Sequence, residues 1–225
     1  MSPELCREIA DTRRKLRALP DGHVLFLDET AMRVNEAPTS TIVLPGEQQF
    51  VLAENTTSYA TRYDMIACCT SKETLPPIIY APNERRKGID TEMLLAYIRD
   101  FLAQSAGALD RYPLTLVVDQ SPIHNTERML EAFHDWGCQE LTEIVLMPSM
   151  SAKRLSPLDN ALFHDWKERV RKHAPITSEN IRRLMSDEWN NLPASLLAAH
   201  YRHCLLRPRQ PLLSDCPAPN VHQHR

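Results

Sequence analysis

The sequence predicts an α/β fold, in which a mixed sheet of antiparallel and parallel strands is flanked by helices. Strand-like apolar runs dominate the first third of the chain, whereas helices and strands alternate from about residue 90 onward. Helical stretches lie before and after the run at residues 113–120, and strands joined by such crossovers are parallel neighbours. With 225 residues, of which 43% are hydrophobic, the chain is long enough for one sizeable core.

The first half of the chain is expected to form one helix and then strands. Apolar residues recur at helical spacing over residues 2–19, and a Pro-Asp-Gly turn follows. HVLFLDET, residues 23–30, has the continuous apolar run of a buried strand. AMRVN, residues 31–35, alternates and is interpreted as the second strand of a hairpin. Two further strands are predicted at SYATRYDMIACCT (58–70) and PPIIYAP (76–82), whereas the turn-rich residues 36–58 give no clear assignment.

The second half alternates between helix and strand. A helix is predicted over residues 90–104, where apolar residues recur at helical spacing. PLTLVVDQ, residues 113–120, is again a continuous buried strand, and the helix after it ends at Gly137 as a C-terminal cap. The remaining predictions are a buried strand at LTEIVLMP (141–148), a loop at SMSAKRL (149–155), a long amphipathic helix at 156–174, and helices around 178–190 and 193–205.

The composition of the chain excludes several classes of protein. The N-terminal stretch is charged throughout and lacks the apolar core of a secretory signal. No apolar run reaches the roughly 18 residues that span a bilayer, so no membrane partner is expected. The six cysteines show no CxxC pair and are interpreted as free thiols in a reducing compartment. We therefore expect an intracellular protein, in the nucleus of a eukaryote or the cytoplasm of a bacterium.

Two predicted core strands end on an aspartate, Asp28 in the first and Asp119 in the strand at 113–120. Ligands bind at the carboxyl edge of open α/β sheets, where loops and helix ends converge. If the two strands are adjacent, the carboxylates project toward one point and repel each other unless one is protonated or a cation lies between them. A divalent cation that prefers hard oxygen ligands, Mg²⁺ or Mn²⁺, meets this requirement.

A third acid, Asp159, lies in the first turn of the predicted helix at 156–174. Phe163 and Trp166 follow it by four and seven residues, so Asp159 lies beside the apolar face of that helix. Each aspartate also has a purely structural interpretation. Asp28 can end a strand in solvent, Asp119 can form an Asx turn, and Ser-Pro-Leu-Asp is a good capping-box start. The conjunction of three acids on two strand ends and one helix start favours a site.

Three blocks of the sequence together resemble the catalytic domain of the mariner-type DDE transposases of the Tc/mariner superfamily. LFLDET is similar to the first block, in which a strand runs into Asp and a second acid. LVVDQSPIHNTERM is similar to the second block, with His124 five positions after the Asp. LMPSMSAKRLSPLDNALFHDWKERV is similar to the third block, in which Ser-Pro-Leu precedes the last acid and an aromatic helix with basic residues follows. The resemblance extends over about residues 20–205.

The resemblance implies an RNase H-like fold and a DDE-type transposase and endonuclease. It implies that Asp28, Asp119 and Asp159 are the catalytic residues and the ligands of two Mg²⁺ (or Mn²⁺) ions, with Asp28 bridging both. The activity would be hydrolysis of phosphodiester bonds and strand transfer on DNA. We expect an N-terminal helix or linker at 1–21, the catalytic domain at 22–206 and a flexible C-terminal tail at 207–225.

DNA, as transposon ends and target, is the partner that the resemblance implies, together with a homodimer and a separate helix-turn-helix DNA-binding module. The net charge of −3 gives no sign of this, but between residues 150 and 175 six Lys or Arg stand against three acids. His124 either touches a phosphate, orients a ligand or packs locally at a helix start. The expected DNA contacts are Arg85, Arg86, Lys87, His124, Lys153, Arg154, Lys167 and Arg171, with Arg169 and Lys172 beside them.

Two other functions fit the same residues. Because only about 20 residues precede the first strand, we expect no helix-turn-helix module within the part of this sequence ahead of it. The chain could therefore be a truncated or domesticated transposase derivative that binds DNA or protein without cleaving. A cellular RNase H-like hydrolase that acts on RNA–DNA hybrids or junctions would use the same acids, since fold alone does not decide function.

Overall fold

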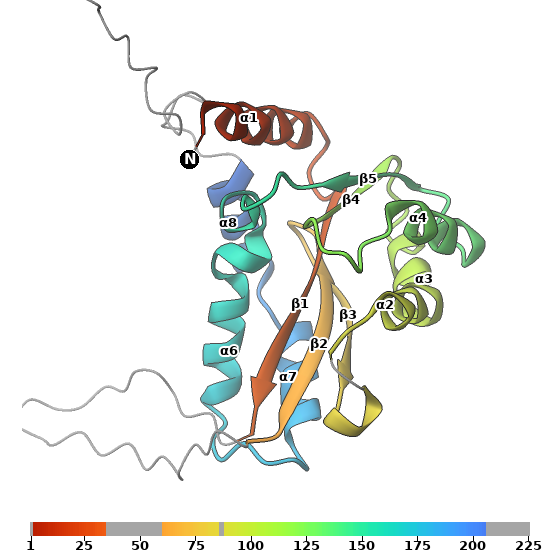
Figure 1. Ribbon diagram of the computed structural model, residues 1–225. Helices are drawn as coiled ribbons and strands as arrows, with labels where there is room; N and C mark the ends of the chain where they lie inside the picture. Colours follow the sequence, from red (N-terminus) through yellow and green to blue (C-terminus); the bar gives the residue numbers. More distant parts are fainter. Residues whose placement is uncertain (1, 35–59, 86–87, 206–225) are drawn as a thin grey trace, which may run out of the picture.

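In the computed structural model, which describes residues 2–34, 60–85 and 88–205, a five-stranded sheet lies between two groups of helices (Figure 1). The strand order is β3-β2-β1-β4-β5. Strand β1 pairs antiparallel with β2 and parallel with β4, and the two outer pairs repeat these senses. The mixed sheet predicted from the sequence is thereby confirmed. The strands are β1 (Val24–Arg33), β2 (Arg62–Cys69), β3 (Thr74–Tyr80), β4 (Leu114–Val118) and β5 (Leu141–Leu146).

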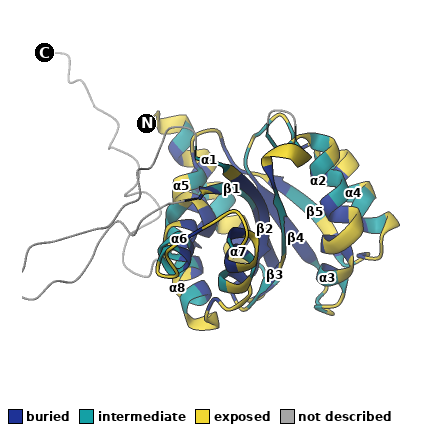
Figure 2. Ribbon diagram, turned by 90° about the horizontal axis from the view of Figure 1, so that it is seen from below, coloured by how far each residue is buried: buried dark blue, intermediate teal, exposed yellow. Residues whose placement is uncertain are grey.

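The helices cover both faces of the sheet. Helices α2, α3 and α4 lie on one face, and α1 and α5 to α8 lie on the other (Figures 1 and 2). A π-helical segment continues α2 into α3, and a second one precedes α6. The helical elements are α1 (Pro3–Arg17), η1 (Pro82–Glu84), α2 (Thr91–Tyr97), η2 (Ile98–Leu102), α3 (Ala103–Gly107), α4 (Thr126–Asp135), α5 (Ala152–Leu155), η3 (Leu158–Leu162), α6 (Phe163–Arg171), α7 (Ile181–Asn190) and α8 (Ala194–Leu205).

Strand β1 is buried on both faces, which explains its continuous apolar run. Phe26 packs into the core under α1 and α5 to α8, whereas Leu25 and Leu27 pack into the core under α2 to α4. Successive side chains of a strand point to opposite faces. The same alternation carries on past the apolar run, so Asp28 lies on the side of Phe26 and Glu29 on the side of Leu27. The face that each acid occupies is therefore set by the packing of the strand before it.

Two local predictions are wrong. AMRVN is not the second strand of a hairpin, because β1 runs without a turn through Arg33 and pairs residue by residue with β2, as in Ala31 with Asp64. The alternation of AMR reflects a continuing strand, since no turn residue separates it from HVLFLDET. Residues 149–155, expected to be a loop, contain the short helix α5. The other helices and strands predicted within the described residues are present.

Several expectations fall on residues that the structure does not describe. They concern the assignment of residues 36–58 and the tail at 207–225. Cys216 also lies outside the described residues, whereas Cys6, Cys68, Cys69, Cys138 and Cys204 are buried thiols that form no disulfide. Among the described helices, none has the length and apolar character that crossing a bilayer requires.

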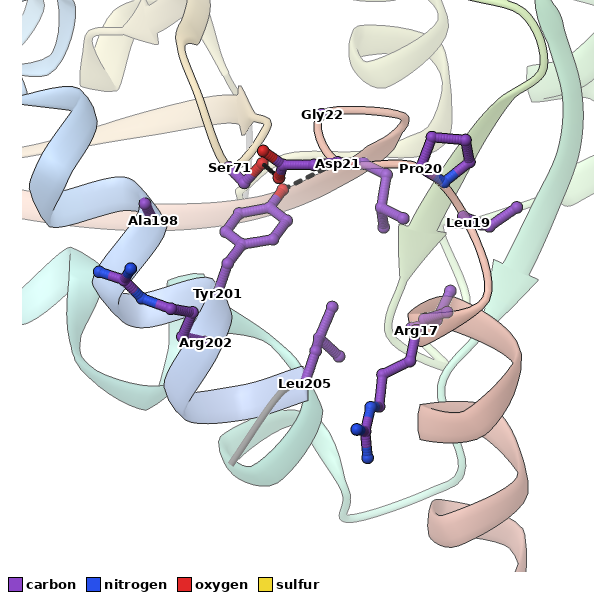
Figure 3. Close-up of a pocket in the computed structure, with 12 residues that line it drawn as sticks. Arg17, Leu19, Pro20, Asp21, Gly22, Ser71, Ala198, Tyr201, Arg202 and Leu205 are labelled. Carbon is purple, nitrogen blue, oxygen red and sulfur yellow. Dashed lines mark hydrogen bonds between the residues drawn. The ribbon is translucent and has the colours of Figure 1, made fainter. Parts of the chain in front are cut away.

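A pocket of about 270 Å³ lies at the start of β1, where Val24 stands four residues before Asp28 (Figure 3). Its walls come from the end of α1, the turn before β1 and helix α8. Tyr201 of α8 reaches across it, and its hydroxyl is shared between the carbonyl oxygens of Val24 at 2.9 Å and Cys69 at 2.8 Å. The hydroxyl of Ser71 also donates to Asp21. These contacts fasten α8 to the first residue of β1 and the last residue of β2.

Candidate active site

The parallel pairing of β1 and β4 brings Asp28 and Asp119 to the same edge of the sheet. The last paired residues are Phe26 and Val117, and each aspartate stands two residues beyond its member of this pair. Both aspartates therefore continue the face on which Phe26 and Val117 pack. Because neighbouring strands lie about 4.8 Å apart, the two carboxylates belong to one local site. The predicted adjacency of the two acids agrees with this placement, but Asp28 does not end its strand as predicted, because β1 continues along β2 to Arg33.

Asp159 joins them from the π-helical segment η3, which packs against β1. The hydroxyl of Ser156 accepts a hydrogen bond from the backbone N–H of Asp159 at 3.3 Å, so the capping interaction anticipated from Ser-Pro-Leu-Asp exists. It does not compete with a role in the site, because the cap uses the backbone of Asp159 and leaves its carboxyl group free to hydrogen-bond with Asp28. The helix start thus places a third acid against the two strand ends.

The proximity of the acids shifts their protonation. Burial raises the pKa of Asp28 well above its usual value, and the charges of Asp159 and Glu29 raise it further. The backbone N–H of Glu29 donates to Asp28 at 2.7 Å and opposes part of this rise. Asp159 is exposed as a whole residue, but desolvation of its carboxyl group raises its pKa, which its hydrogen bond with Asp28 partly offsets. Without a cation, this pair favours holding a proton.

Asp119 is held differently, by His124 in the loop after β4. The His124 Nδ1 atom lies 2.8 Å from Oδ1 of Asp119 and 3.0 Å from the backbone oxygen of the same residue. The hydrogen bond with His124 lowers the pKa of Asp119. Burial alone would lower the pKa of His124, but its hydrogen bonds to Asp119 and Glu29 outweigh this and raise it to about 10. Asp119 is therefore the aspartate that remains ionised most readily.

The residues of the site fit a divalent cation, although within the described ranges no three acidic, His or Cys side chains form a ready-made metal cage. The donors are carboxylate oxygens, the ligands that Mg²⁺ and Mn²⁺ prefer. Oδ1 of Asp119 is buried, and the carboxylates around His124 raise the pKa of its ring to about 10. Asp28 is desolvated beside other carboxylates, an arrangement that a cation would stabilise. Both observations indicate a local demand for positive charge.

The residues predicted to contact DNA are placed in different ways. Lys153 and Arg154 are exposed on α5, and Lys153 is close enough to Asp159 to lower its pKa. Lys167 is half-buried, and Arg171 pairs with Glu168 of its own helix at 2.7 Å. These basic residues remain predicted contacts. Of the predicted contacts, Lys153 is the one that the electrostatics place beside an acid of the site, Asp159.

Two predicted contacts are engaged within the fold instead. The side chain of Arg85 is 12% exposed and pairs with Asp64, which is itself buried on β2. The side chain of His124 has no exposed surface, because it lies between Asp119 and Glu29. A phosphate therefore has no surface of His124 to contact in this structure. Arg86 and Lys87 lie outside the described residues.

The residue that the sequence interpretation missed is Glu29. Because side chains of a strand alternate, Glu29 points to the other face of the sheet from Asp28. His124 nevertheless reaches it around the edge, with Nε2 at 3.2 Å from Oε1 of Glu29. The available signal was the pair Asp28-Glu29 together with His124, which stands five positions after Asp119. Sequence spacing alone did not show that a loop side chain crosses the sheet edge.

Structural comparison places this site in a known fold. No protein-family model matches the chain, and no curated protein matches it in sequence. The Mos1 transposase paired-end complex with left transposon end superposes with a TM-score of 0.68 at 13% identity, over 92% of this chain and 61% of that chain. The Mos1 mariner paired end complex with Mn gives 0.62 at 12% identity, over 92% and 61%. The catalytic domain of Mos1 mariner transposase gives 0.60 at 10% identity, over 90% and 89%.

These likenesses establish an RNase H-like fold, that of the Mos1 catalytic domain, as the sequence resemblance implied. The chain spans about three-fifths of the Mos1 chains in the DNA complexes and nearly the whole of the separate catalytic domain. Solved Mos1 structures also include complexes with Mn and with Mg. At this level of identity the comparison concerns the fold, and the chemistry of this chain rests on its own residues.

Proposed function

We propose that this chain is the catalytic core of a DDE-type transposase, a metal-dependent DNA endonuclease that also transfers strands. One observation carries the proposal. Asp28, Asp119 and Asp159, which are distant along the chain, meet at the carboxyl edge of the sheet and influence one another's protonation. In an RNase H-like fold, acids at that edge are positioned by rigid elements rather than by loops alone.

In this proposal the three aspartates bind metal ions, and the strands that carry two of them fix their positions. Asp28, Asp119 and Asp159 would hold two Mg²⁺ or Mn²⁺ ions, which, when bound, supply charge neutralisation at a phosphodiester and an activated nucleophile. Asp28, whose pKa is raised by the charges of both other acids, is the shared ligand of the proposal. The paired strands β1 and β4 fix two of the three carboxylates before substrate arrives, so little reorganisation remains at the moment of reaction.

DNA is the proposed substrate and partner. The Mos1 complexes are described as containing a transposon end, and the same class of ligand suits the basic residues that lie beside Asp159 here. Lys153 and Arg154 would contact backbone phosphates, which fix the register of DNA without reading its sequence. A second copy of the chain and a separate helix-turn-helix module complete the proposed assembly, in line with the sequence resemblance.

Nicking of supercoiled plasmid DNA in the presence of Mn²⁺ tests the proposal. The parent protein is expected to nick, and Asp119→Asn is expected to lower the rate by about 100-fold or more, because loss of a ligand should cost at least as much as loss of an outer-sphere partner. Asp135→Asn, an exposed acid at the end of α4, serves as the matched control and should leave the rate unchanged. Equal nicking by the parent and Asp119→Asn would overturn the proposal.

A second function is favoured by one observation. The carboxylate of Asp119 faces the buried ring of His124, with Oδ1 2.8 Å from Nδ1. A derivative that binds DNA or protein without cleaving fits this arrangement. Salt-dependent DNA binding by the parent, with no nicking at any Mn²⁺ concentration, would favour it over the first proposal. Cleavage confined to RNA–DNA hybrids in the same assay would instead indicate an RNase H-like hydrolase.

A further inference from the structure

His124 is the buried side chain that links the two faces of the sheet at the active edge. It lies in the loop after β4, where its backbone N–H closes a turn on the carbonyl oxygen of Ser121 at 3.0 Å. Its ring has no exposed surface, and each of its two nitrogens meets a different carboxylate. Nδ1 lies 2.8 Å from Asp119, and Nε2 lies 3.2 Å from Glu29. A ring held at both nitrogens is not free to rotate.

The two carboxylates come from different strands and from opposite faces. Asp119 follows β4 and faces the acids of the site, whereas Glu29 belongs to β1 and faces the core under α2 to α4. The hydrogen-bonded series Glu29–His124–Asp119 therefore connects one face of β1 to the opposite face of the sheet at the end of β4. Asp28 stands directly beside Glu29, so the same strand supplies one acid of the site and the anchor for another.

The contact is selective for one of the three aspartates. Asp28 and Asp159 hydrogen-bond with each other, whereas Asp119 is oriented by the histidine. Histidines and carboxylates that hold a ligating side chain from behind commonly change metal affinity by about 10–100-fold when they are removed. A histidine needed only for packing would not require a carboxylate on both nitrogens.

The surroundings of Glu29 make the contact testable without disturbing the core. The Glu29 side chain is 21% exposed and borders an open pocket of about 280 Å³, which Ser121, Ile123 and Asp64 also line. A shorter side chain at position 29 therefore leaves no sealed cavity. Substitution there should spare the fold, in contrast to substitution of the fully buried His124.

We propose that Glu29 and His124 are a positioning pair that orients the Asp119 carboxylate for metal binding. This inference rests on the proposed function, because it assumes that Asp119 is a metal ligand. Neither residue of the pair is assigned contact with DNA or with the reacting phosphate. The pair acts through Asp119 alone.

Two substitutions at Glu29 separate contact from charge. Glu29→Gln keeps an oxygen acceptor at the same distance from Nε2 and removes the charge. Glu29→Asp keeps the charge and withdraws the acceptor by one methylene, about 1.5 Å, beyond hydrogen-bond range. Glu127→Gln, an exposed acid on α4, is the matched control. The measurement is the Mn²⁺ dissociation constant from electron paramagnetic resonance of free Mn²⁺, with the melting temperature recorded for each variant.

Positioning predicts that Glu29→Asp weakens Mn²⁺ binding by about 10-fold or more, whereas Glu29→Gln stays within about threefold of the parent. Melting temperatures should stay close to that of the parent for both. If all Glu29 variants bind Mn²⁺ as the parent does, the positioning pair is refuted while the proposed function stands. If Glu29→Gln is the weaker binder, Glu29 acts by charge and the inference is wrong. If the parent binds no Mn²⁺, both proposals fail together.

Discussion

At the scale of single residues, Asp28 is where packing and the proposed chemistry conflict. It ends the apolar run of β1 and is desolvated, with Asp159 and Glu29 beside it. A carboxylate in that environment is held at a cost unless a cation or a proton is present. Natural proteins tolerate such a cost at functional sites. Asp28 therefore marks the site through its unfavourable environment as well as through its place in the sequence.

Replacing Asp28 with Asn should stabilise the metal-free protein at neutral pH. Asn keeps an oxygen that accepts from the Glu29 N–H and gains an amide that donates to Asp159, without the charge. The pKa of Asp28 is higher in the folded than in the unfolded state. The protonated Asp28 therefore contributes fully to the stability of the folded protein below its unfolded-state pKa, and this contribution is lost as the pH rises through its folded-state pKa. A gain of about 1 kcal/mol would raise the melting temperature by roughly 2–4 °C.

Thermal melts in EDTA check this expectation. The gain of Asp28→Asn should be present at pH 7.5 and shrink toward pH 4, near the unfolded pKa of aspartate. Asp135→Asn, whose acid is exposed, should show no such dependence. A less stable Asp28→Asn protein at pH 7.5 would contradict the electrostatic account of the site.

At the scale of elements, the sequence predicts the strands well because β1 and β4 are buried on both faces and read as continuous apolar runs. It also predicts that their ends share an edge, since crossover helices make them parallel. It does not predict the length of β1, because its partner β2 lies beyond residues 35–59 and strand pairing is not local. Helix α5 was missed because four residues carry too little periodicity to distinguish a helical turn from a loop.

In the site, too, features carried by local sequence could be predicted, whereas contacts between distant residues could not. The three aspartates could be predicted because Asp28 and Asp119 follow continuous apolar runs and Asp159 stands in the first turn of an amphipathic helix, features that local sequence carries. The partners of Asp119 could not, because the His124–Glu29 contact depends on how a loop crosses the sheet edge. The ion pairs of Arg85 and Arg171 could not be predicted either, since they depend on which acids folding brings beside these side chains.

Helix α8 supplies a prediction about how the elements are fastened together. Tyr201→Phe removes the hydroxyl that the carbonyl oxygens of Val24 and Cys69 share, at the end of the sheet away from the acids. Loss of a buried hydrogen-bond donor should lower the free energy of unfolding by about 1–3 kcal/mol. Urea denaturation measures it, with Tyr112→Phe, a tyrosine that is 72% exposed, as the control.

The Tyr201 variant also separates stability from chemistry. Because the hydroxyl bonds the first residue of β1 and the last residue of β2 and contacts none of the three acids, Mn²⁺-dependent nicking per folded molecule should be unchanged at a temperature where both proteins are folded. A loss of nicking without a loss of stability would show that the pocket at the start of β1 takes part in the activity.

At the scale of the whole molecule, the net charge of −3 is a poor guide to binding, because charge is distributed unevenly. Lys153 and Arg154 are exposed on α5, and Lys153 lies close to Asp159. Arg182 and Arg183 of α7 instead pair with Glu84 and Asp187. Phosphate contacts release condensed counterions, so a DNA-binding face is recognised by the salt dependence of affinity rather than by the total charge.

The double variant Lys153→Gln/Arg154→Gln should therefore weaken DNA binding and reduce the slope of log K against log salt by up to about 2. Arg182→Gln/Arg183→Gln removes the same charge from α7 and should leave the slope unchanged. Fluorescence anisotropy of labelled duplex DNA at several salt concentrations gives both slopes. Equal reductions in the two variants would mean that binding follows net charge and that α5 is not the DNA-contacting face.

The direct test of the central claim is anomalous diffraction from crystals soaked in Mn²⁺, collected for the parent protein and for Asp28→Asn. We predict anomalous density among the carboxylate oxygens of Asp28, Asp119 and Asp159 in the parent, and its loss or strong reduction in the variant. Ordered Mn²⁺ elsewhere on the protein with none at these three residues would contradict the assignment of this edge of the sheet as a metal-dependent active site.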